Sequence, residues 1–141
     1  MQQSETIKVS VVIQAGVDKV WDSFTNPLHI IGWNFASDDW HCPKAENDLQ
    51  QGGRFSSRME AKDGSMGFDF GGTYTFIIPF EKIEYILDDG RKISVQFKKI
   101  DDNTTEVIEI LEPETQNTKE LQEQGWQAIL NQFKKYIESL Q

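Results

Sequence analysis

The carboxyl-terminal stretch from residue 118 to residue 140 constrains the fold of this chain more than any other feature. Asn117 is placed to cap a helix, and Glu120 follows three residues later, as in a capping box. One side of the predicted helix is apolar and the other is polar, so we expect it to lie against another layer. The apolar stripe comprises Leu121, Trp126, Ile129, Leu130, Phe133, Ile137 and Leu140, and the polar face comprises Gln122, Glu123, Gln127, Asn131, Lys134, Lys135 and Glu138.

Strand patterns precede this helix. Apolar residues recur at every second position in the first strand, and the Asp-Gly pairs at residues 63–64 and 89–90 favour tight hairpins because glycine adopts positive φ angles. Gly71 and Gly72 would let the longest strand bend and the sheet curl. We therefore predict an α+β fold with a curved, six-stranded antiparallel sheet around the long helix. Its strands are Ile7–Ile13, Arg54–Ala61, Gly67–Ile78, Lys82–Leu87, Lys92–Ile100 and Thr105–Glu112.

Two short helices and a long loop are predicted after the first strand. Apolar residues recur at helical spacing from Val17 to Phe24, and the pair Asn26-Pro27 is suited to cap and begin a second helix. Residues 32–53 have no clean period and are predicted to form an aromatic-rich loop, of the kind that more often covers a site than merely connects elements. No linker or repeat interrupts the chain, so residues 1–141 are expected to form a single domain.

Charge and cysteine content exclude several classes of protein. Lysine and arginine total 14 against 23 aspartates and glutamates, and the resulting net charge of −9 would repel nucleic acid and anionic membrane surfaces. A single cysteine, Cys42, cannot form an internal disulfide, and the first residues lack the basic start and apolar run of an export signal. No stretch of about 18 apolar residues could span a membrane. We expect a soluble, cytoplasmic protein, either a monomer or a homodimer.

Several motifs resemble the START-like (SRPBCC, helix-grip) superfamily, and one branch of it in particular. That branch is similar to the carboxyl-terminal domain of activators of the heat-shock chaperone ATPase. The resemblance implies a helix-grip fold, a cavity where START-like proteins hold lipids, hormones or polyketides, and a link to chaperones and the stress response. The matching stretches are Val20-Trp21, Phe24-Thr25-Asn26-Pro27, Trp33, Asp39-Trp40-His41-Cys42-Pro43, Asn47-Asp48-Leu49, Gly52-Gly53-Arg54-Phe55, residues 64–74, Asp89-Gly90-Arg91 and Gly125-Trp126-Gln127.

A cavity is also expected on geometric grounds, because a curved sheet and a straight helix cannot touch along their whole length. Gly125 lies on or beside the apolar stripe of the helix. Either it leaves room for a ligand, or a strand or aromatic ring packs closely against it. The leading hypothesis is a protein that binds a small apolar or amphipathic molecule. The residues predicted to line the cavity are Trp33, Met59, Phe70, Tyr74, Trp126, Ile129 and Phe133.

Two other functions stay open at this point. One is a chaperone cofactor that acts through its surface, and the other is a cyclase- or hydrolase-like enzyme with Tyr74 or His41 as acid or base. His41 and Cys42 diverge along an extended chain, and structural zinc needs four ligands at recurrent spacings. We therefore expect no metal, no cofactor and no catalytic residue. Arg58 and Asp69 are predicted to form an ion pair on the outer face of the sheet.

Overall fold

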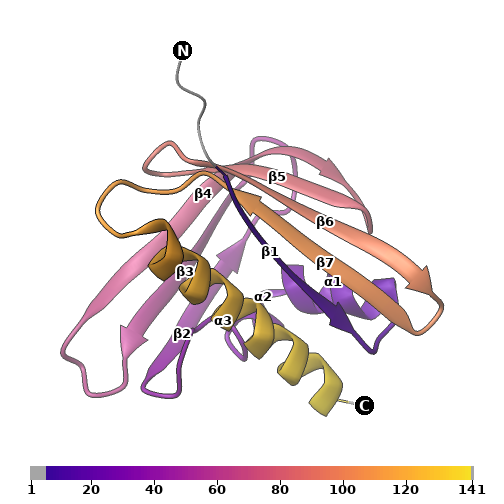
Figure 1. Ribbon diagram of the computed structural model, residues 1–141, viewed down its shortest axis with the longest axis horizontal. Coiled ribbons are helices and arrows are strands. Elements are labelled where there is room, and N and C mark those ends of the chain that lie inside the picture. The colour runs from indigo at the N-terminus through magenta and orange to yellow at the C-terminus, as the bar shows by residue number, and fades with distance from the viewer. Residues whose placement is uncertain (1–5, 141) are drawn as a thin grey trace.

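The computed structural model describes residues 6–140, which form one curved antiparallel sheet with a long helix lying across it (Figure 1). The prediction about an export signal lies partly outside these residues. Predicted strand bounds differ from the observed ones by no more than one residue. The elements are β1 (Ile7–Ile13), α1 (Val17–Thr25), α2 (Pro27–Ile30), β2 (Trp40–Asn47), β3 (Arg54–Ala61), β4 (Gly67–Ile78), β5 (Lys82–Leu87), β6 (Lys92–Asp101), β7 (Thr104–Leu111) and α3 (Lys119–Ser139).

The sheet has seven strands, so the prediction of six is wrong. Their spatial order is β1-β7-β6-β5-β4-β3-β2, with every neighbouring pair antiparallel and with β1 and β2 at the two edges. The additional strand is β2, which lies inside residues 32–53, the segment predicted to be a loop. Its register against β3 shifts where Cys42 and Pro43 together lie opposite the single residue Met59. This bulge breaks the period-2 pattern that would reveal a strand, and an edge strand tolerates the proline.

Helix α3 begins and ends within one residue of the predicted range 118–140, but its cap and its buried face differ from the prediction. Thr118, and not Asn117, caps the helix, because its hydroxyl accepts a hydrogen bond from the N–H of Leu121 at 3.1 Å. Leu121 and Leu140 were expected in the apolar stripe but are 55% and 45% exposed. Gln122 was expected in solvent but is buried. The inward face at the start of α3 is therefore one position away from the predicted one.

The main core lies where α3 meets β1 and α1. Phe133 is fully buried there, and its ring lies edge-on to Phe24 at 5.4 Å and to Trp33 at 4.7 Å between centroids. The beginning of α3 lies in front of β3 and β4 in the view of Figure 1. Helix α3 packs closely against β1, whereas residues of α3, β3 and β4 together line a cavity.

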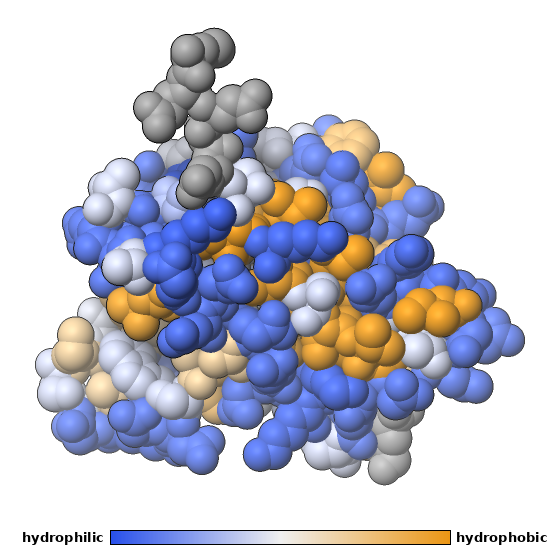
Figure 2. Space-filling view, in the orientation of Figure 1, coloured by the Kyte–Doolittle hydropathy of each residue, from blue (hydrophilic) through white to orange (hydrophobic). Residues whose placement is uncertain are grey.

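The outer surface is largely hydrophilic on the face that carries α3, with hydrophobic residues gathered in the middle of that face (Figure 2). On the sheet, Arg58 and Asp69 lie opposite each other on β3 and β4, and their side chains are 3.5 Å apart. The predicted ion pair is confirmed. Within residues 6–140, no helix is long and apolar enough to cross a membrane.

Candidate functional site

A cavity of about 330 Å³ lies between α3 and the inner face of the sheet. Eight of the described residues that line it are aromatic: Phe24 comes from α1, Trp33 follows α2, Phe55 comes from β3, Phe68, Phe70 and Tyr74 come from β4, Tyr85 from β5 and Trp126 from α3. The rings contact one another across the strands, as in the edge-on pair of Phe55 and Tyr85 at 4.9 Å. Aromatic side chains from six separate segments therefore line one largely apolar space.

Six of the seven residues predicted from the sequence to form the ligand site lie around this space, namely Trp33, Met59, Phe70, Tyr74, Trp126 and Ile129. Phe133 does not. It follows Ile129 by one helical turn, at a point where α3 has come down onto the sheet and no gap is left. Phe133 is a core residue, and its ring supports the cavity wall from behind through Trp33.

Gly125 opens into the cavity. A Cβ atom placed on this glycine would meet no other heavy atom within 4 Å, apart from its own chain neighbours and the helix backbone. The alternative of a closely packed strand or aromatic ring at this position is therefore wrong. The missing side chain leaves part of the cavity unfilled.

Tyr74 is held by a polar chain that ties three elements together. Its hydroxyl donates to Oδ1 of Asn47 at 2.5 Å, and Nδ2 of Asn47 donates to the carbonyl of Thr25 at 2.6 Å. Burial raises the pKa of Tyr74 well above its ordinary value, although the hydrogen bond with Asn47 opposes that rise. The phenol thus stays protonated at neutral pH and serves to join β4, β2 and the end of α1.

Within residues 6–140, the lining of the cavity includes neither His41 nor Cys42. His41 lies 3.9 Å from Glu60 on the neighbouring strand. The Cys42 thiol is buried and donates a weak hydrogen bond to the carbonyl of Lys44 at 3.5 Å, and burial raises its pKa. In the described part of the chain, no three His, Cys, Asp or Glu side chains are grouped closely enough to hold a metal ion. The two candidate acid–base groups, Tyr74 and His41, are not adjacent.

Glu109 lies on the cavity wall and was not predicted. It is only 7% exposed, and burial raises the pKa of its carboxyl to about 8. Nearby, burial and the Glu109 charge raise the pKa of Tyr85. Glu109 shares the inward parity of β7 with Val107 and Leu111. Because the opposite parity carries Ile108 and Ile110, alternation alone does not tell which side of this strand faces inward.

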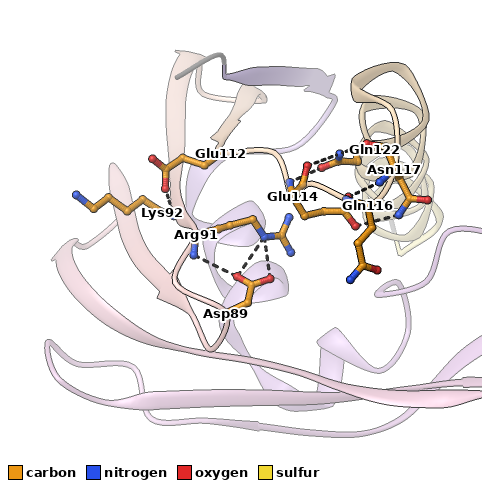
Figure 3. Close-up of polar contacts among 8 residues, drawn as sticks. All are labelled: Asp89, Arg91, Lys92, Glu112, Glu114, Gln116, Asn117 and Gln122. Carbon is orange, nitrogen blue, oxygen red and sulfur yellow. Dashed lines mark hydrogen bonds and ion pairs between the residues drawn. The ribbon is translucent and has the colours of Figure 1, made fainter. Parts of the chain in front are cut away.

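The rim of the cavity beside α3 is polar and closely hydrogen-bonded (Figure 3). Nε of Arg91 donates to the two carboxylate oxygens of Asp89 at 2.9 Å and 3.1 Å. Glu114 accepts hydrogen bonds from the backbone N–H groups of Gln116 and Asn117, which lower its pKa, and the charge of Arg91 lowers it further.

The amide of Gln122 joins α3 to the segment between β7 and this helix. It accepts from the backbone N–H of Glu114 at 2.8 Å and donates to the carbonyls of Glu114 and Asn117 at 3.1 Å and 2.9 Å (Figure 3). These three bonds explain why a glutamine expected in solvent is buried.

Comparison with known proteins gives one family. Residues 14–138 match the family described as Activator of Hsp90 ATPase homolog 1-like protein. The AHSA1-like protein from Aeromonas hydrophila is 41% identical, with 95% of this chain and 94% of that one covered and a TM-score of 0.86. A Cytophaga hutchinsonii protein is 48% identical, with 95% and 92% covered and a TM-score of 0.81. A Chromobacterium violaceum protein, 24% identical over 95% and 98% of the chains, shares the fold with a TM-score of 0.82. No curated protein matches this sequence.

Proposed function

This chain belongs to the family of Activator of Hsp90 ATPase homolog 1-like proteins, and from that premise we propose that it binds a small apolar or amphipathic molecule between its sheet and α3. The observation that carries the proposal is the aromatic cavity of about 330 Å³. Ligand sites in proteins are concave, mostly apolar and about 300–1,000 Å³ in volume, so this cavity suits a small ligand. Trp33, Met59, Phe70, Tyr74, Trp126 and Ile129 are the proposed contacts.

Two polar groups of the aromatic wall are bonded within the protein. Nε1 of Trp33 donates to the carbonyl of Ser23 at 2.9 Å, and the hydroxyl of Tyr74 donates to Asn47. The rings of Trp33 and Tyr74 therefore offer a ligand their faces and edges and not their hydrogen-bonding groups. A ligand that is apolar along most of its length, with polar groups confined to one end, complements such a wall.

The open position at Gly125 allows a direct test. Gly125→Phe is expected to fill the cavity and weaken the binding of decanol at least tenfold, whereas Gly125→Ala keeps binding and stabilises α3 by about 1 kcal/mol. Tryptophan fluorescence titration measures the affinity, and native mass spectrometry of gently purified protein detects a retained ligand. Gln124→Phe is the matched control, because Gln124 is exposed in the same helical turn. Unchanged decanol binding by Gly125→Phe, or no saturable binding by the unaltered protein, would contradict the proposal.

A chaperone cofactor that acts through its surface is the second candidate, and the observation that favours it is the family match over residues 14–138. In that case the protein should change the ATPase rate of Hsp90, and Gly125→Phe should leave this effect intact because the substitution lies inside the cavity. The measurement is the steady-state ATPase rate of the chaperone with increasing amounts of this protein. A rate that does not change at saturating amounts removes this candidate.

A further inference from the structure

Resting on the proposed function, we infer that the ligand of this cavity carries a protonated amine, which the carboxyl group of Glu109 binds at the polar end of the cavity. Glu109 projects from the inner face of β7, and Tyr85, Arg91 and Gln122 lie on the same cavity wall. The inference names the chemical class of the ligand, an apolar body with a cationic nitrogen.

The first observation is that the Glu109 carboxyl has no hydrogen-bond or ion-pair partner among the described residues. Within residues 6–140, no group donates a hydrogen bond to its carboxyl oxygens, and none of the polar side-chain atoms there is both fully enclosed and unbonded. Because the side chain is 93% buried and yet lines the cavity, its open hydrogen-bonding capacity faces the cavity space. A buried carboxyl group without a partner destabilises a protein, and a donor that enters the cavity would remove that cost.

The second observation is the balance of charge around the cavity. Two acids, Glu46 and Glu109, and one cation, Arg91, lie among the described residues that line it. Arg91 and Glu46 each have an ion-pair partner: Nε of Arg91 is bonded to both oxygens of Asp89 (Figure 3), and the exposed Glu46 lies 3.1 Å from Nζ of Lys44. Among the described residues that line the cavity, Glu109 is the charged side chain without such a partner. An anionic ligand would have to compete with the Asp89 carboxylate for Arg91. A cationic ligand meets the buried carboxyl group of Glu109, in a chain whose net charge is −9.

The third observation is the nature of the surrounding walls. The faces of aromatic rings attract an ammonium group within about 6 Å of the ring centroid, and this attraction is strongest where water is excluded. Glu109 is flanked in the sheet by the uncharged residues Val9 and Val95. Besides Glu46 and Arg91, the other titratable or aromatic residues that line the described cavity are Phe24, Trp33, Phe55, Phe68, Phe70, Tyr74, Tyr85 and Trp126. A lining rich in aromatic rings, in which Glu109 supplies a buried carboxyl group, is suited to an amine and poorly suited to a carboxylate.

Amine binding must be coupled to a proton. With a pKa of about 8, the Glu109 carboxyl is mostly protonated in the free protein at pH 6 to 7. When an ammonium ion binds, the carboxyl ionises and its proton passes to the solvent, so the complex holds a carboxylate and an ammonium. The affinity for an amine should therefore rise roughly tenfold for each pH unit between pH 6 and pH 8, and about one proton should be released at pH 6.

The experiment compares decylamine, decanol and decanoate, all below the concentrations at which they form micelles. Isothermal titration calorimetry at pH 6, 7 and 8, in buffers of different ionisation enthalpy, gives both affinity and proton release. We expect decylamine to bind most tightly and with the stated pH dependence. Glu109→Gln should weaken the binding of decylamine at least tenfold and abolish the pH dependence of its affinity. The affinity for decanol should change less than threefold. Gly125→Phe should weaken all three ligands, which separates cavity binding from attraction to the acidic surface.

The outcomes distinguish this inference from the proposed function. If decanoate binds more tightly than decylamine and its affinity falls as the pH rises, the ligand is an anion and the amine inference is wrong. The inference is also wrong if decylamine binds no more tightly than decanol and if Glu109→Gln leaves both affinities unchanged. The carboxyl group would then have no role in binding. Both results leave ligand binding in the cavity in place. If none of the three ligands binds, the proposed function fails and the inference fails with it.

Discussion

Glu109→Gln is expected to make the protein several kcal/mol more stable than the unaltered chain at pH 8 and above. The carboxyl of Glu109 has an ordinary pKa of 4.5 when the chain is unfolded, and burial raises it to about 8 in the folded protein. Between these values the folded state holds a proton that the unfolded state lacks. Glu109 therefore contributes its full stability below pH 4.5, and this contribution falls as the pH rises to 8.

The expected slope is about 1.4 kcal/mol per pH unit, which amounts to about 5 kcal/mol over the whole interval. The glutamine side chain does not ionise, so the variant lacks this loss. Urea unfolding of both proteins at pH 5, 6, 7, 8 and 9 gives the difference in unfolding free energy at each pH. The decisive quantity is the increase of this free-energy difference with pH. A carboxyl and an amide also differ in their hydrogen bonds, but that contribution is the same at every pH and does not affect the increase.

Other acids do not obscure this measurement. Hydrogen bonds and ion pairs lower the pKa of Asp88, Glu114 and Glu138, so the stability that these groups contribute is lost at pH values below the ordinary range of a carboxyl. Glu106→Gln is the matched control, because Glu106 lies on the opposite face of the same strand. Parallel stability curves for Glu109→Gln and the unaltered protein from pH 5 to pH 9 would show that Glu109 is ionised in the folded state.

Much of the fold follows from the sequence because each predicted element carries a strong local pattern. The Asp-Gly turns end in Gly64 and Gly90, whose φ angles of 78° and 94° are those that glycine adopts readily. Strand β2 lacks such a pattern, since Pro43 and the bulge around it interrupt the alternation of buried and exposed residues. Such an edge strand is identified by its pairing with β3, which lies further along the chain, and not by a local sequence pattern.

The candidate site is less predictable, because its lining depends on which parity of each strand faces inward. Both parities of β7 are apolar around Glu109, and only the register against β1 and β6 turns this carboxyl toward the cavity. The inward face of α3 is hard to predict at its start for the same reason, because either Leu121 or Gln122 could face inward there. Hydropathy favours the leucine, but the amide bonds of Gln122 to the preceding segment decide the outcome.

Phe133→Ala is expected to destabilise the protein by about 3–5 kcal/mol, the usual cost of removing a buried phenylalanine from a core. The ring is fully buried and contacts Phe24 and Trp33, so its loss would leave a cavity bordered by two aromatic rings. Leu121→Ala is the matched control from the same predicted stripe. Because Leu121 is 55% exposed, its truncation should change the unfolding free energy by less than about 0.5 kcal/mol.

Urea unfolding of the two variants at pH 5, where Glu109 is protonated in the folded protein, measures both effects. Many domains have an unfolding free energy of only about 5–15 kcal/mol, so the loss expected for Phe133→Ala could unfold the protein. Phe133→Leu is a milder variant that should stay folded. That variant should bind decanol within about twofold of the unaltered protein, because Phe133 lies behind the wall and not on it. A large loss of decanol affinity with little loss of stability would contradict the assignment of Phe133 to the core, because it would show that this ring acts on the ligand, directly or through its contact with Trp33.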